Sequence, residues 1–467
     1  MGRQIRNVYI VHHSHTDVGY TDLQEQIIYN QVNNIRNVVQ IIKSGYGKDA
    51  PEKNLKWNCE TYYCVEQFLK GASPAERADF FDLVRKGNIG ISATYLNFTD
   101  LADVGMLDYK TSGMLKTFAE EGILVKTAMN ADINGISMGA RDVLIRNGIE
   151  FLFTNIHTHH GMYPLYQNQK PYFWENGEGG RILVWSGEHY HLGNALGIAS
   201  TDLEALHGKL EESIREYEES GYPYDFFITS VSGVCSDNAP ANPDIVNTVD
   251  EFNGRFGEEM TLRMVTLQEL YDLIREETAD APVYRGAIND WWGNGVGSTP
   301  YAVKHYKEAL RLSHVCDRLE EKTGQRDERL WEIGAENALL YAEHTWGHSA
   351  TITNPYDTMV TNLDIRKTSY AARAHEAGAM RKSGQCHLLG DILRYYNSRG
   401  QVKAVSMDSK GGLFPVEFFV EHGLSGGESD GYGDGQGAAG TDFRPSKGEA
   451  DKFPGGICAH GREAVLL

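Results

Sequence analysis

Short apolar segments alternate with amphipathic ones along roughly the first 280 residues of the chain. Val8–Val11 has no charged position, which is typical of a strand that is buried on both faces of a parallel sheet. A helical stripe follows, with apolar residues at positions 28, 32, 35, 39 and 42. Because about seven or eight such strand–helix units succeed one another, we predict an α/β fold built on one β/α barrel. A doubly wound open sheet is the alternative, although no Gly-x-Gly-x-x-Gly motif supports a dinucleotide fold.

Polar residues ahead of the apolar stripes predict where three helices begin. Thr21-x-x-Gln24 and Thr266-x-x-Glu269 have the form of capping boxes, in which two side chains satisfy amide groups of the first turn. Ser137 is a candidate cap for a helix that would end before Asn147.

The pattern changes after residue 290 or so. Three apolar stripes with helical spacing predict a helical bundle over residues 291–385, packed against a barrel over residues 1–290. Residues 402–407 and 413–420 have the composition of β-strands, and beyond residue 423 the chain is rich in glycine and has no periodicity. For residues 386–467 we therefore expect a short β segment and a disordered or artefactual tail, as at a truncated gene end.

Composition narrows the class of partner. A net charge of −20 argues against binding to nucleic acid or to anionic membranes, because both bind through basic surface patches. Neutral ligands such as sugars are more compatible with this charge. The six cysteines form no Cys-x-x-Cys pair, so neither a disulfide framework nor a structural zinc knuckle is expected. No apolar signal segment precedes the first strand, and no apolar run approaches the roughly twenty residues that span a bilayer. We expect a cytoplasmic protein.

A polar cluster follows the first predicted strand. His12, His13, His15 and Asp17 lie within six residues, and two residues apart at a strand end His15 and Asp17 can point the same way. Imidazole and carboxylate groups suit a divalent metal such as zinc, whereas the alternative is that they only cap the strand. Other predicted strands also end in polar residues, which would gather on one rim of a barrel: Glu60, Asp132, His157 and Asp237.

Four segments in this order resemble glycoside hydrolase family 38, the α-mannosidases. His15–Tyr20 resembles the family's His-x-Asp-x-Gly-Trp segment, and Asn130–Ser137 resembles the segment that carries its nucleophilic aspartate. Ser236–Asn238 resembles the turn with its acid, and Ala342–His348 falls where the family supplies its last zinc histidine. The resemblance extends over roughly residues 5–385. It implies a seven-stranded β/α barrel, then a helical bundle and then β-sandwich domains.

The resemblance also implies roles for single residues. One zinc ion would be held by His15, Asp17, Asp132 and His344, with Asp132 also the nucleophile and Asp237 the general acid/base. Tyr20 would stack under the sugar ring, in the place of the family's tryptophan. From the residues themselves, Glu60 on the rim and the aromatic loop with Trp291 and Trp292 are further candidates for substrate contact, although the tryptophans suit plain packing equally well.

The chemistry of a retaining glycosidase agrees with this set. One carboxylate attacks the anomeric carbon while another protonates the leaving oxygen. A neighbouring cation keeps the first ionised, and burial raises the pKa of the second. Zinc with open coordination could hold two vicinal hydroxyl groups, and the cis hydroxyls of mannose suit that contact. We therefore predict a zinc-dependent retaining glycosidase of α-mannosidase type that cleaves α-linked sugars of glycans or oligosaccharides.

The sequence departs from the family pattern at three places and leaves two alternatives. Tyr20 replaces a tryptophan, Asp132 lacks a following Pro-Phe-Gly-His, and Thr345 replaces the aspartate after the last zinc histidine, which leaves His348 as a rival ligand. His13-x-His15-x-Asp17 also resembles the start of amidohydrolase-like barrels that use two metals. The other alternative is an inactive relative that only binds sugar.

Overall fold

The computed structural model describes residues 4–45, 55–158, 165, 167–235, 237–288, 290–398, 405–407 and 413–415. It divides into two compact units. The first unit comprises Met1–Pro300 with Leu339–Thr368, and the second comprises Tyr301–Ala338 with Ser369–Leu467. The predicted boundaries at residues 290 and 385 stay a prediction.

The first unit contains a parallel sheet of order β3-β2-β1-β8, with β9 also paired to β1. Its strands are β1 (Asn7–His13), β2 (Trp57–Cys59), β3 (Ile89–Ile91), β8 (Phe226–Ser232) and β9 (Thr261–Met264). The register of β1 on β8 runs from Asn7 opposite Phe226 to His13 opposite Ser232. Val8, Ile10 and Val11 are fully buried, whereas Tyr9 is partly exposed, so the predicted two-sided burial is confirmed at three of the four positions.

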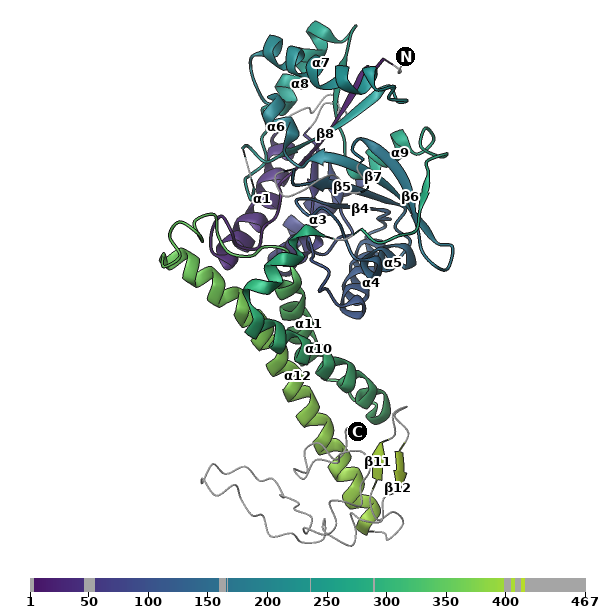
Figure 1. The fold of residues 1–467 in the computed structure, drawn as a ribbon, viewed down its shortest axis with the longest axis vertical. Coiled ribbons are helices and arrows are strands. Elements are labelled where there is room, and N and C mark those ends of the chain that lie inside the picture. The colour runs from purple at the N-terminus through teal and green to yellow at the C-terminus, as the bar shows by residue number, and fades with distance from the viewer. Residues whose placement is uncertain are drawn as a thin grey trace. The chain divides into compact units, whose positions relative to one another are not determined.

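A second sheet of the first unit has the order β10-β6-β7-β5-β4 (Figure 1). Its strands are β4 (Thr127–Asn130), β5 (Phe151–Ile156), β6 (Lys170–Glu175), β7 (Arg181–His189) and β10 (Val283–Tyr284). All neighbours are parallel except β6 and β7, and β6 was not among the predicted strands. The fold is thus a mixed α/β structure with parallel sheets and helices, and a closed seven-stranded barrel is not shown.

Helices alternate with these strands. They are α1 (Gln24–Ser44), α2 (Tyr62–Gly71), α3 (Pro74–Arg85), α4 (Val104–Glu120), α5 (Met138–Arg146), α6 (Leu192–Leu196), α7 (Leu203–Glu219), α8 (Ile245–Phe256), α9 (Leu267–Ile274) and the 3₁₀ helix η3 (Trp291–Ser298). In Figure 1, α4 and α5 lie side by side, and α5 packs on β7. Within the described residues, no helix combines the length and the apolarity that crossing a bilayer requires.

Two of the three predicted helix caps are confirmed. The hydroxyl of Ser137 accepts from the backbone amide of Ala140, and Thr266 forms a capping box with Glu269. The capping box at Thr21 is wrong, because α1 begins at Gln24 after an uncapped Leu23.

Beyond residue 300 the predicted helices are present as α10 (Pro300–Thr323), α11 (Glu328–Ala342) and α12 (Thr358–Ser398). In the second unit, the Arg381 guanidinium on α12 donates to Glu320 and Ser313 on α10. Two short strands, β11 (Val405–Met407) and β12 (Leu413–Pro415), pair in antiparallel fashion. The glycine-rich tail predicted from residue 424 onward lies outside the described residues.

Candidate metal and catalytic site

Four polar side chains meet at the carboxyl ends of the parallel strands. His15 and Asp17 follow β1, Asp132 follows β4, and His344 follows α11 within the first unit. All four residues are buried, with exposed fractions between 0% and 6%. The sequence prediction that these residues belong to one site therefore has a geometric basis.

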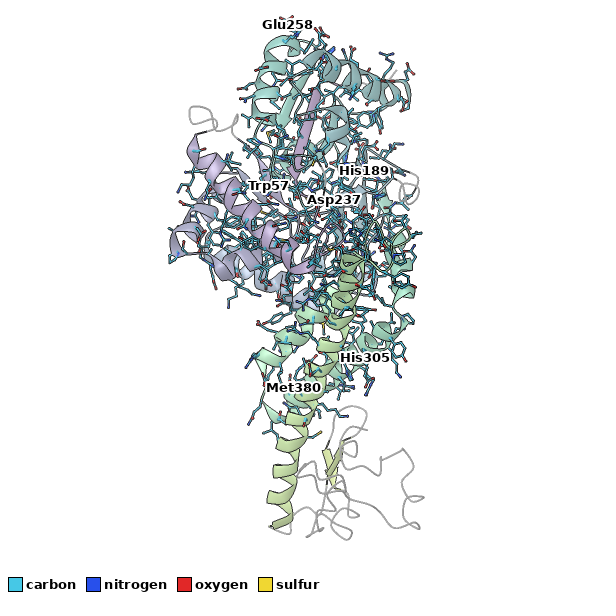
Figure 2. The ribbon with its side chains drawn as sticks, turned by 90° about the vertical axis from the view of Figure 1, so that its left-hand side faces the viewer. Trp57, His189, Asp237, Glu258, His305 and Met380 are labelled. Atoms are coloured by element: carbon cyan, nitrogen blue, oxygen red, sulfur yellow. The ribbon has the colours of Figure 1, made fainter. Side chains whose placement is uncertain are left out.

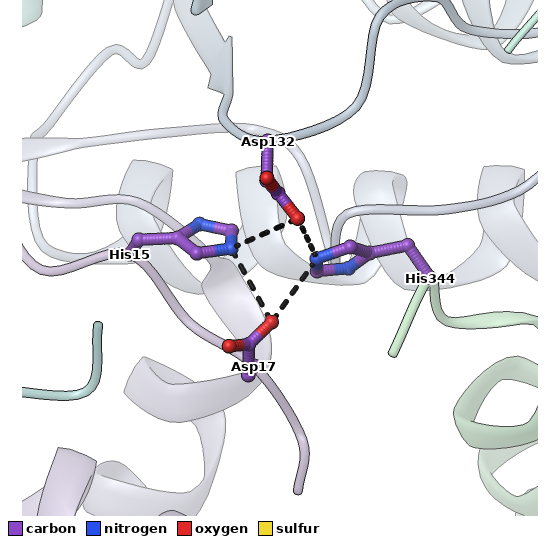
Figure 3. Close-up of side chains that lie close together, drawn as sticks. All are labelled: His15, Asp17, Asp132 and His344. Carbon is purple, nitrogen blue, oxygen red and sulfur yellow. Dashed lines mark ion pairs between the residues drawn. The ribbon is translucent and has the colours of Figure 1, made fainter. Parts of the chain in front are cut away.

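The four side chains converge on one point (Figure 3). His344 Nε2 lies 3.2 Å from both Asp17 Oδ1 and Asp132 Oδ2. His15 Nε2 lies 3.4 Å from Asp17 Oδ1 and 3.8 Å from Asp132 Oδ2. One nitrogen or oxygen from each residue thus lies within 4.8 Å of all the others, which is the spacing of atoms that share a metal ion.

Each histidine has a second buried carboxylate beside its other ring nitrogen. His15 Nδ1 is hydrogen-bonded to Glu60 Oε1 at 3.0 Å. His344 Nδ1 lies 2.9 Å from Glu343 Oε1 and is hydrogen-bonded to the backbone oxygen of Asn97 at 3.3 Å. Metal-binding histidines commonly donate their other ring nitrogen to a carboxylate in this way. With Nδ1 used as the donor, Nε2 of each ring presents its lone pair to the cluster.

Unpartnered atoms and charge both indicate that this group of residues fits a cation. In the described part of the chain, His15 Nε2, His344 Nε2 and Asp132 Oδ1 are buried without a hydrogen-bond partner, which is costly unless something binds them. Burial opposes protonation of His15, yet the carboxylates of Glu60 and Asp17 raise its pKa well above the usual value. A bound divalent cation would supply the positive charge that these carboxylates favour.

The carboxyl group of Asp237 faces the same pocket as the cluster. That pocket is lined by Asp17, Tyr20, Asp132, His157, Tyr190, Asp237, Trp292, His344, Thr345 and Trp346. Figure 2 labels Asp237 in the interior of the first unit, whereas Glu258 lies at its outer end. Burial, followed by the charge of Asp17, raises the pKa of Asp237 to about 6. Such a carboxyl group retains its proton at mildly acidic pH, as a general acid requires.

Three residues on the wall and rim of this pocket have left-handed backbone conformations. The φ angles are 58° at Tyr20, 68° at Asp132 and 56° at Asn238, in a region that residues other than glycine rarely adopt. Such conformations persist only where the surrounding structure holds them, and they are concentrated at functional sites.

The predicted substrate-contact residues have different positions. Tyr20 and Trp292 line the pocket, and the Trp292 indole donates to the backbone oxygen of Asp132 at 3.0 Å. The side chain of Trp291 lies outside the described part of the structure. The side chain of Glu60 is fully buried and accepts from Asn97 behind His15, and its predicted contact to substrate stays a prediction.

The rival ligand His348 is not part of the cluster. Its Nδ1 accepts from the backbone amide of Ala350, and its backbone pairs with that of Tyr20 at the pocket rim. Among the described residues, the cluster therefore contains His344 as its histidine from this segment.

Sequence reasoning missed several residues of the site. Tyr190 has its ring centroid 4.5 Å from that of His15, and the hydroxyl of Thr345 lies 3.2 Å from Asp17 Oδ1. Trp346 forms part of the pocket wall, and Glu343 supports His344. The last three lie in the segment that carries His344, so their proximity in sequence was a usable signal, whereas nothing in the pattern indicated Tyr190.

Comparison with known proteins assigns the class. The sequence model named Glycosyl hydrolases family 38 N-terminal domain matches residues 6–287. This match covers more than half of the chain and agrees with the site just described. The chain belongs to glycosyl hydrolase family 38.

Solved structures of family members have the same fold. An alpha-mannosidase from Enterococcus faecalis V583 superposes with a TM-score of 0.62 at 15% identity, covering 83% of this chain and 43% of that one. A second protein of the family, from Enterococcus faecalis, gives a TM-score of 0.56 at 13% identity, with coverages of 83% and 40%. The chain thus spans less than half the length of either protein. No curated protein matches the sequence.

Proposed function

We propose that this protein is a zinc-dependent retaining glycosidase of α-mannosidase type. The observation that carries the proposal is the shared pocket of Asp132, which belongs to the four-residue cluster, and Asp237, whose carboxyl group has a raised pKa. Membership of glycosyl hydrolase family 38 supports a glycosidase. It also favours this function over an amidohydrolase-like one.

The two carboxyl groups divide the reaction between them. The Asp132 carboxylate attacks the anomeric carbon, and the glycosidic bond breaks as Asp237 donates its proton to the leaving oxygen. Asp237, now ionised, accepts a proton from the water that hydrolyses the glycosyl ester of Asp132. Zinc held by His15, Asp17, Asp132 and His344 would supply Lewis-acid contacts to sugar hydroxyl groups.

Aromatic side chains support a carbohydrate substrate. Tyr20, Trp292 and Trp346 line the pocket and could cover the apolar face of a sugar ring. A pocket with these walls beside a metal site suits a sugar with vicinal cis hydroxyls, such as an α-linked mannose.

We also propose that the two sheets together form the barrel that the family resemblance implies. Hydrogen bonds join the two sheets: Ala93 N donates to Thr127 O at 2.9 Å beyond β3, and Gln169 Nε2 donates to Ile228 O on β8 at 2.6 Å. These contacts support the proposal because Ala93 follows β3, Thr127 begins β4 and Gln169 precedes β6.

Metal removal tests the proposed function. The protein is freed of metal with a chelator and assayed on aryl α-mannoside, α-glucoside and β-mannoside. We expect no hydrolysis without metal, recovery on adding about one equivalent of zinc per chain, and preference for the α-mannoside. Full hydrolysis by the chelated protein would exclude the metal role, and a zinc-loaded protein that cleaves none of the three would contradict the glycosidase.

A further inference from the structure

A buried ion pair lies directly behind the ligand histidine His344. Glu343 has no exposed side-chain surface and Lys367, at the start of α12, has 5%. Lys367 Nζ donates to Glu343 Oε2 at 3.2 Å. Both residues belong to the first unit.

The oxygens of Glu343 face groups of the metal cluster. Oε1 lies 2.9 Å from His344 Nδ1 and accepts from the hydroxyl of Thr345 at 2.5 Å. That hydroxyl lies 3.2 Å from Asp17 Oδ1. One carboxylate therefore contacts one ligand directly and is connected to a second through Thr345.

Lys367 holds this carboxylate in place from the other side. Its ammonium group donates to the backbone oxygens of Leu340 at 3.1 Å and Glu343 at 2.7 Å, where α11 ends and carbonyl groups lack helical partners. It also lies 4.5 Å from the centre of the Trp346 ring, which forms part of the pocket wall. Lys367 thus joins the helix end, the carboxylate and the pocket wall.

An ion pair buried this deeply is not explained by stability. Desolvation of two charges commonly cancels their attraction, and a well-packed apolar pair would fill the same space at no such cost. The Glu343 carboxylate does place a negative charge 2.9 Å from His344 Nδ1, beside the Asn97 backbone oxygen that is hydrogen-bonded to the same nitrogen. Together they favour one ring orientation and keep the proton on Nδ1.

We propose that Glu343 and Lys367 are a positioning pair that sets the metal affinity of the site, with Glu343 orienting His344 and Lys367 holding Glu343. This inference rests on the metal site of the proposed function. It assigns no contact with substrate to either residue.

Zinc affinity of the complete chain tests the pair. The dissociation constant for zinc is measured by competition with a chromophoric chelator, and thermal unfolding is recorded on the metal-free protein. The variants are Glu343→Gln, the double variant Glu343→Gln with Lys367→Met, and Lys110→Met. Lys110 is the control, because its ion pair with Glu66 (2.8 Å) has a buried lysine and neither residue belongs to the cluster or lines the pocket.

We expect both Glu343 variants to bind zinc about 10–100-fold more weakly than the wild type. The double variant should regain stability that Glu343→Gln loses, because no uncompensated lysine remains buried, yet its zinc affinity should stay low. Lys110→Met should lose stability, but its zinc affinity should stay within about twofold of the wild type, because an ion pair that contributes only to folding does not contact the zinc ligands.

Wild-type zinc affinity in the folded double variant would overturn the inference, as would equal weakening by Lys110→Met. If Glu343→Gln does not fold, the charge-balanced double variant decides. A wild type that binds no zinc would overturn both this inference and the proposed function. A wild type that binds zinc, loses affinity in the Glu343 variants and cleaves no glycoside would support the pair and contradict only the glycosidase.

Discussion

Asp132 and Asp237 line the same pocket in different surroundings. Asp132 directs Oδ2 at His344 Nε2, 3.2 Å away, and its backbone is held in a left-handed conformation. Asp237 lies apart from the cluster, and burial together with the charge of Asp17 raises its pKa to about 6. Surroundings that raise the pKa of one carboxyl group suit that group to proton donation.

This difference predicts the behaviour of Asp237→Asn. Without its proton donor, the enzyme should lose about 10²–10⁴-fold in kcat/KM on an alkyl α-mannoside, and far less on a dinitrophenyl α-mannoside whose leaving group needs no proton. Since the proposed acid acts only when protonated, wild-type kcat/KM should fall as pH rises through about 6. Bound metal would offset the charge of Asp17 and lower the pKa of Asp237, so this fall would then occur at a lower pH. This fall in kcat/KM with rising pH should be absent in Asp237→Asn.

Steady-state kinetics on both substrates between about pH 4 and 8 check the prediction. Asp225→Asn is the control, because Asp225 lies before the opposite end of β8 and should leave rate and pH profile unchanged. Equal losses on the two substrates would assign Asp237 some other role.

At the scale of elements, the sequence correctly predicted features that depend on residues close together in the chain. Ser137 and Thr266 cap their helices through contacts three residues away, and the apolar run of β1 is buried as expected. Thr21 failed as a cap because its hydroxyl accepts from the Asn238 amide, a partner distant in sequence. β6 was missed because its antiparallel pairing with β7 interrupts the strand–helix alternation used to find strands.

Contacts between elements also predict which glycine cannot change. An added Cβ at Gly90 on β3 would lie 2.2 Å from Asn58 Oδ1, which accepts from Leu267 N while Nδ2 donates to Val265 O. Gly90→Ala must displace this buried amide, and we expect a loss of about 2–5 kcal/mol from overpacking and unpaired backbone groups. Gly113, exposed within α4, has no atom near the added Cβ, so Gly113→Ala should gain about 0.5–1 kcal/mol.

Urea unfolding of the two variants and the wild type, followed by circular dichroism, provides the measurement. A wild-type midpoint for Gly90→Ala would show that β3 does not pack against Asn58 as described.

At the scale of the molecule, the sequence predicted the residues of the four-residue cluster better than the residues that support them. His15, Asp17, Asp132 and His344 follow strands or lie in segments that resemble a known family, and the structure brings them within 4.8 Å of one another. The support of His344 by Lys367 depends on how α12 returns to the end of α11, and no local pattern encodes that approach. The burial of Glu60 behind His15 depends on neighbours such as Asn97, which lies far from Glu60 in the sequence.

Because the cluster joins three segments far apart in the chain, metal binding should stabilise the first unit as a whole. An ion that binds only the folded state adds about 2.7 kcal/mol at a concentration 100 times its dissociation constant, and about 1.4 kcal/mol for each further tenfold increase. Tm should therefore rise with zinc concentration in scanning calorimetry and return to its starting value with chelator.

His15→Ala should abolish the rise. His207→Ala should preserve it, because His207 belongs to the other candidate group in the described residues, whose partners Glu211 and Glu259 are exposed. A zinc-dependent rise that survives in His15→Ala and disappears in His207→Ala would place the ion at the surface group and contradict binding at the buried site that joins the ends of β1, β4 and α11.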